Sequence, residues 1–164
     1  MSAQVNPGRH TAAAEGDVVV FLIGMRINRL WALRSWLPVF TAMPRMLREL
    51  SRDKGSGFLG YRLLFGGRVI CVLQYWSTKE QLFSYAAQQD KQHRPAWTAF
   101  NRRARAGKGR VGIWHETYAV PAGSYESVYV DMPGFGLGGV AGVVPVGRRG
   151  ETAAQRLKAG ERAA

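Results

Sequence analysis

The chain has 164 residues, of which 46% are hydrophobic and 11% aromatic, and this composition suits one domain with a substantial apolar core. Its longest uncharged stretch near the start, residues 18–25, is far shorter than the roughly 20 apolar residues that cross a bilayer, and no secretory signal precedes it. We therefore expect a cytoplasmic protein without a membrane span, and the single cysteine, Cys71, excludes an internal disulfide.

The net charge of +12 favours an anionic partner in principle, but the distribution of charge argues against one. Ten of the 23 basic residues fall in two patches, residues 102–110 and 148–162. No helix-turn-helix, zinc-finger or aromatic RNA-binding signature accompanies them. We expect a solvated loop and tail, and no nucleic-acid partner.

Residues 1–16 are rich in Ala, Gly and polar side chains without periodicity, which predicts a flexible arm with an unstructured His10. Residues 18–28 predict a central strand that turns Arg26 and Asn28 to one face near its end. Its other face is wholly apolar, with Val19, Phe21, Ile23, Met25 and Ile27.

A helix is expected after Ser35, a capping residue, because apolar residues then recur every three or four positions. Pro44 is expected to kink or split it. Residues 57–65 and 68–76 predict two strands, and the Gly-Gly pair at 66–67 predicts a tight hairpin between them.

Ser77 and Glu80 have the spacing of a capping box, which predicts the start of a second helix. Arg94 is expected to break this helix because the following proline disfavours helical backbone, and a continuation is expected to reach about Arg103. Residues 111–120 predict the last long strand.

The order of these elements predicts an α+β fold of ferredoxin-like topology, βαββαβ, with one antiparallel sheet and both helices on one face. The second sheet face then needs cover, from which we expect a face-to-face homodimer. We expect a domain at 17–131, preceded by the arm at 1–16 and followed at 132–164 by a Gly-rich arm and a basic tail. The Gly-rich segment is expected to form a loop or to wrap the partner, and the tail to be disordered or a frayed helix.

His93 shares one helical stripe with Trp97, so we expect the imidazole to face inward. An inward histidine is compatible with a hydrogen-bonded core residue and with a functional one. Trp76 ends the preceding strand, and the two tryptophans could wall a pocket between helix and sheet.

His115 and Glu116 are neighbours on the last strand, so their side chains are expected on opposite faces. Glu116 shares its face with Trp114 and Tyr118. A carboxylate between aromatics is either paired structurally or an acid with a raised pKa. The histidines and glutamate lack the spacing of a zinc site, so no metal is expected.

Six separated motifs stand out along the chain: FLIGMRIN (21–28), QYWS (74–77), HRPAW (93–97), GIWHETY (112–118), YE (125–126) and DMP (131–133). Together they resemble a monooxygenase-like family that contains a tailoring monooxygenase of fumagillin biosynthesis. The resemblance covers roughly residues 17–140 and implies a dimeric α+β barrel of the antibiotic-biosynthesis-monooxygenase type.

The resemblance implies an oxidoreductase without a cofactor that acts on an apolar secondary metabolite in a helix–sheet pocket. The catalytic candidates are His93 as the base, His115 as its competitor, and Glu116. The expected substrate-binding residues are Trp76, Trp97, Asn28, Arg26 and Tyr118.

Two alternatives stay open. The first is a haem-binding enzyme, in which His93 or His115 would ligate iron, helped by Asn28 and Trp76, and Arg26 or Arg94 would receive the propionates. The second is a non-catalytic dimer that binds a small apolar ligand.

Overall fold

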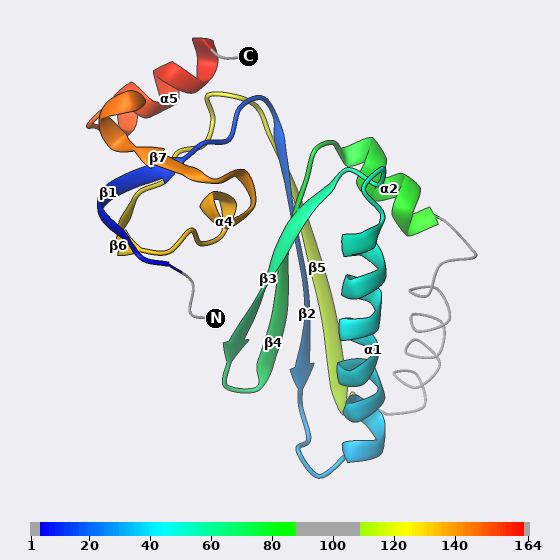
Figure 1. Cartoon of the computed structure of the whole chain (residues 1–164). Coiled ribbons are helices and arrows are strands. Elements are labelled where there is room, and N and C mark those ends of the chain that lie inside the picture. The colour runs from blue at the N-terminus through cyan, green and yellow to red at the C-terminus, as the bar shows by residue number, and fades with distance from the viewer. Residues whose placement is uncertain (1–3, 88–108, 163–164) are drawn as a thin grey trace.

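The computed structural model describes residues 4–87 and 109–162. Its main layer is a four-stranded antiparallel sheet in the order β3-β4-β2-β5, with helices α1 and α2 on one side (Figure 1). The chain order β2-α1-β3-β4-α2-β5 is the predicted ferredoxin-like βαββαβ arrangement, so the α+β fold class is confirmed. The elements are β2 (Val18–Ile27), α1 (Leu33–Arg52), β3 (Phe58–Gly66), β4 (Val69–Trp76), α2 (Lys79–Ala87) and β5 (Val111–Val120).

The central strand β2 sets the two faces of this sheet. Its odd-numbered residues, from Val19 to Ile27, point toward the helices, and we call this side the helix face. Its even-numbered residues point to the other side, the outer face. Alternation along residues 18–27 thus predicted correctly which residues share the helix face, while Val18 and Gly24 are buried on the outer face as well.

Two apolar clusters join the helices to the helix face. At one end Met25, Ile27 and Val111 are buried against Trp36 and Val39 of α1. At the other end lie Val19, Trp76, Leu50 of α1 and Leu82 of α2. Burial at both ends fixes α1 along the sheet.

Helix α1 differs from its predicted form. It begins at Leu33 without a side-chain cap, and it runs to Arg52 as one helix with Pro38 and Pro44 inside. The helix is therefore not split. Leu47, beyond the second proline, is buried, and this packing outweighs the backbone hydrogen bond that a proline removes.

The cap of α2 is displaced by one residue from the predicted position. Thr78, rather than Ser77, accepts a hydrogen bond at its hydroxyl oxygen from the backbone N–H of Gln81, at 3.1 Å. The helix therefore starts with the pair Thr78 and Gln81, a T-x-x-Q variant of the capping box.

A second sheet, in the order β6-β1-β7, was not predicted. It lies with α4 and α5 at the upper end of the main sheet in Figure 1, away from α1. Residues 6–12 form its central strand, so the prediction of a loose N-terminal arm is wrong, and His10 pairs with Tyr129 and Pro145. The elements are β1 (Asn6–Ala12), β6 (Tyr129–Met132), α4 (Leu137–Ala141), β7 (Val143–Pro145), a 3-10 turn (Val146–Arg148) and α5 (Ala153–Arg162).

The Gly-rich segment and the tail are also more ordered than predicted. Leu137 of α4 packs with Val18 and Tyr75 on the outer face of the chain's own sheet. Arg149 donates to the carbonyl of Ala14, and α5 carries the buried Arg156, so neither cation is a solvated tail charge. We call β6, β7, α4 and α5, together with the N-terminal strand β1 that pairs with two of them, the C-terminal unit. No helix within the described ranges is long and apolar enough to cross a membrane.

Candidate functional site

His115 lies on the helix face of the edge strand β5, in register with Ile23 of β2. Its position is midway along the sheet, between the two clusters that hold the helices. The imidazole is exposed, and its ring centre lies 6.0 Å from that of Phe21. The neighbouring Thr117 is exposed as well. The described residues thus place an accessible imidazole beside an aromatic ring.

His93 and Trp97, the leading predicted base and one predicted wall, lie outside the described residues, as does Arg94. Their inward orientation therefore stays a prediction. Of the predicted catalytic residues, the structure describes His115 and Glu116. It confirms that these two side chains point to opposite faces, because Ile23 and Leu22, their partners on β2, do so.

Trp76 is a core residue in the described structure. Its side chain is 0% exposed, and its indole N–H donates to Oε1 of Gln74 at 3.0 Å. The rings of Phe58 and Tyr85 pack on it, with centres 5.2 and 5.6 Å away. Trp76 therefore supports the sheet and the start of α2 and has no surface free for a substrate.

The tyrosine that covers Trp76 makes stability sensitive to alkaline pH. Burial first, and then the carboxylates of Glu49 and Asp53, raise the pKa of Tyr85 to about 12. The neutral hydroxyl is thus favoured in the folded chain relative to an ordinary pKa near 10. The stabilisation of the folded chain that comes from this pKa difference is complete below about pH 10 and is lost as the pH rises toward about 12.

We expect the free energy of unfolding to fall between about pH 10 and 12, and to fall less steeply in Tyr85→Phe. Urea unfolding at a series of alkaline pH values measures this. Tyr75 and Tyr125 also have raised pKa values from burial, so a residual decline remains in the variant. Equal slopes in both proteins would show that Tyr85 is not the group responsible.

Asn28 and Arg26 do not meet Trp76. The Asn28 side chain accepts from Arg26 and donates to the carbonyl of Gly109 at 2.8 Å, just past the end of β2. Trp76 pairs with Val19 near the start of β2, nine residues away, which is about 30 Å along a strand. The predicted haem environment of Asn28 and Trp76 therefore does not fit the described residues. Within them, no group of three His, Cys, Asp or Glu side chains could hold a metal ion.

Glu116 and Tyr118 form a pair on the outer face. The phenol donates to Oε2 of Glu116 at 2.8 Å, and this bond raises the pKa of Tyr118. Trp114 packs against Gly24 on the same face, where a Cβ on the glycine would come within 2.6 Å of the indole. Glu116 and Tyr118 are therefore structurally paired and face away from the helices.

A cavity of about 310 Å³ lies on the outer face under the C-terminal unit, and the sequence did not predict it. The sheet supplies the floor and the segment after β5 the walls. The aromatic residues that follow β5 are the signal that could have revealed it. The lining includes Val18, Val20, Leu73, Tyr75, Tyr125, Glu126, Tyr129, Phe135 and Leu137.

The polar groups around this cavity are already engaged. The hydroxyl of Tyr125 donates to the carbonyl of Gly16 at 2.8 Å, and that of Tyr129 accepts from the backbone of Gly138 at 2.9 Å. Glu126 accepts from Arg156 at 2.8 Å. What remains is an open, largely apolar pocket, suited to a small uncharged molecule.

Comparisons with known proteins identify relatives. Monooxygenase af470 of Aspergillus fumigatus is 30% identical over 127 residues, covering 71% of this chain and 44% of that protein, so the chain spans less than half the length of this curated relative. SnoaB, a cofactor-independent oxygenase from Streptomyces nogalater, is 15% identical over 62% of this chain and 91% of its own, with a TM-score of 0.40. Rv0793 from Mycobacterium tuberculosis is 15% identical over 62% and 93%, with a TM-score of 0.42.

A sequence profile provides the family assignment. The profile described as Monooxygenase af470-like matches residues 18–137, which include the whole four-stranded sheet, both of its helices and, from the C-terminal unit, strand β6 and the first residue of α4. This range agrees with the extent of the resemblance seen in the separated motifs. The chain belongs to the Monooxygenase af470-like family.

Proposed function

We propose that this protein is a monooxygenase-type oxidoreductase that needs no cofactor and oxidises an apolar metabolite on the helix face of its sheet. One observation carries the proposal beyond family membership. The exposed imidazole of His115 stands beside Phe21, between the two clusters that pack α1 and α2. An aromatic surface with one basic group is what such chemistry requires of a protein.

The proposed reaction starts with proton transfer from an acidic C–H group of the substrate to His115. The resulting carbanion passes one electron to O₂, and the carbon radical and superoxide combine to a peroxide. If the reacting carbon is a CH₂ group, loss of water leaves a ketone. One oxygen atom enters the product and the other leaves as water, so no external reductant is needed.

The test is oxygen uptake by the purified protein with an enolisable cyclic diketone as the probe, in buffer containing a metal chelator. We expect uptake that saturates with the probe and yields a product heavier by one oxygen atom and lighter by two hydrogens. An absence of uptake above the protein-free rate, across a panel of such probes, would contradict the proposal.

The cavity on the outer face favours a second candidate function, the binding of a small apolar ligand without catalysis. The polar groups of Tyr125, Glu126 and Tyr129 in its lining are engaged, so it offers shape and apolar contact rather than reactive groups. Val20→Phe would fill it, whereas Leu22→Phe changes the same face outside the lining. This candidate is favoured if the unmodified protein and Leu22→Phe bind a small apolar probe, Val20→Phe does not, and the unmodified protein takes up no oxygen.

The homodimer remains part of the proposal. The half of the outer face not covered by the C-terminal unit exposes Leu64 and Tyr118 and partly exposes Trp114. An apolar sheet face of this kind is usually covered by a second copy. Light scattering is expected to give twice the chain mass of 18.1 kDa, and a monomeric mass at micromolar concentration would count against it.

A further inference from the structure

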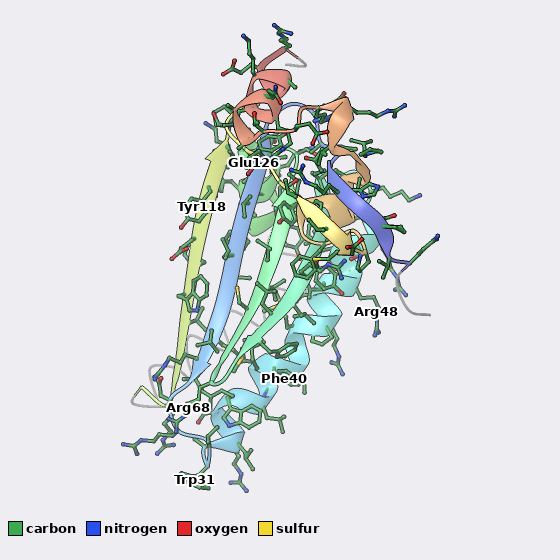
Figure 2. All side chains as sticks on the ribbon, turned by 90° about the vertical axis from the view of Figure 1, so that its left-hand side faces the viewer. Trp31, Phe40, Arg48, Arg68, Tyr118 and Glu126 are labelled. Carbon is green, nitrogen blue, oxygen red and sulfur yellow. The ribbon has the colours of Figure 1, made fainter. Side chains whose placement is uncertain are left out.

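One end of the main sheet gathers five arginines from three separate segments of the chain. We call this surface the arginine pole and define it by Arg26, Arg29, Arg34, Arg68 and Arg110. Backbone hydrogen bonds hold its segments together: the carbonyl of Arg110 accepts from Asn28 and Arg29, and the carbonyl of Arg68 accepts from Ile27. In Figure 2 the labelled Arg68 and Trp31 both lie at this end.

Among the described residues, no acidic side chain pairs with the arginines of the pole. No acidic residue occurs between Asp17 and Glu49 or between Asp53 and Glu80, the stretches that supply four of the five arginines. Such a field attracts anions over about 8 Å at physiological salt.

Large apolar side chains project from the same pole. Trp31 is 91% exposed, its chain neighbours Leu30 and Leu33 are exposed too, and so is Phe65 beside the β3–β4 hairpin. The loop that carries Leu30 and Trp31 is held in place, because the indole of Trp36 donates to the carbonyl of Leu30 at 3.0 Å. An almost fully exposed tryptophan on a fixed loop is therefore a built feature of the surface.

We infer that the arginine pole docks the protein on an anionic lipid surface, with Trp31 and Leu30 in the headgroup layer and the arginines on lipid phosphates. Tryptophan beside arginine and aliphatic residues is the composition of the membrane–water interface. A nucleic acid would satisfy the arginines but would leave Leu30 and Leu33 without apolar contact. A lipid surface therefore accounts for both the arginines and the exposed apolar side chains at this end of the sheet.

Docking in this way orients the molecule. In Figure 1 the C-terminal unit is at the opposite end of the sheet from the β2–α1 connection, so it would face the aqueous side. His115 lies midway along the sheet, and an apolar substrate could pass from the membrane to the helix face over a short distance. The docking itself does not depend on the proposed catalysis.

Sedimentation with vesicles tests the inference. We expect the protein to pellet with vesicles of phosphatidylcholine and phosphatidylserine, and to remain in solution with phosphatidylcholine alone. Arg29→Glu/Arg34→Glu should weaken binding by about tenfold or more. Arg45→Glu/Arg48→Glu is the matched control, since it makes the same charge change at exposed sites farther along α1, and it should bind much more strongly than the pole variant.

Quenching by lipids with brominated acyl chains tests the insertion of Trp31. We expect fluorescence quenching in the unmodified protein and its loss in Trp31→Phe. The inference is overturned if neither vesicle is bound, if the two double variants lose binding equally, or if quenching survives in Trp31→Phe. Binding of a single-stranded RNA through the same arginines without vesicle binding would also overturn it and would indicate a nucleic-acid site.

Discussion

Replacement of Trp76 by alanine is expected to lower the free energy of unfolding by about 3–5 kcal/mol, the range for truncating a fully buried aromatic side chain. The indole is enclosed by Phe58 and Tyr85, and its N–H bonds to Gln74. Truncation would leave a cavity where β4 meets α2 and would also remove the hydrogen-bond donor. Urea unfolding followed by circular dichroism measures the change.

Trp31→Ala is the matched control, because it deletes the same atoms from a side chain that is 91% exposed. We expect this variant to stay within about 0.5 kcal/mol of the unmodified protein. If the two variants were equally stable, Trp76 would not be the core residue that the structure shows.

Removing the carboxylate of Glu126 is expected to lower the free energy of unfolding substantially, though less than Trp76→Ala. Arg156 has a side chain only 6% exposed, and it meets Glu126 at 2.8 Å while donating to the carbonyls of Gly150 and Glu151. Breaking a buried ion pair costs about 3–5 kcal/mol. Glu126 is itself 32% exposed, so for Glu126→Gln we expect a loss toward the lower end of that range.

The exposed pair of Arg9 and Glu151 supplies the control for this prediction. Its atoms are 3.0 Å apart, but the side chains are 50% and 62% exposed, and such pairs contribute about 0–1 kcal/mol. Glu151→Gln should therefore be nearly neutral. Hydrogen exchange should show faster opening of α5 in Glu126→Gln alone, and unchanged exchange in α5 would contradict the assigned role of Arg156.

The parts of the fold that local rules determine were predictable. Alternating side chains predicted which residues of β2 share the helix face, and the glycine pair predicted the hairpin. The turn itself is shifted by one residue, to Gly67 and Arg68: Gly66 still pairs with Val69, and Gly67 has a φ of 58°. The opposite directions of His115 and Glu116 followed from the period of a strand. Each of these depends on a few neighbouring residues.

The C-terminal unit was missed because its contacts are distant in sequence. Strand β1 has little intrinsic strand preference, with Asn6, Pro7 and Gly8 at its start, and it exists through pairing with β6 and β7, more than 100 residues away. Arg156 likewise looked like a solvated tail cation, and only the position of Glu126 makes it a buried one.

The candidate site was partly misjudged for a related reason. The haem-binding alternative implied by the resemblance required Asn28 and Trp76 to lie in one site. The register of β2 with β4 places Trp76 opposite Val19, so the two residues lie at opposite ends of the sheet. Sequence pattern predicts which face a side chain takes, but antiparallel direction and register decide which residues meet.

The most direct test of the central claim compares histidine variants in the oxygen-uptake assay with the diketone probe. We predict that His115→Ala lowers the rate by about 100-fold or more, as expected for loss of a general base. His10→Ala, a substitution in β1 of a histidine whose buried Nδ1 has no hydrogen-bond partner in the described structure, should keep the full rate. A full rate in His115→Ala, with activity lost in His93→Ala, would contradict the account and assign the base to His93.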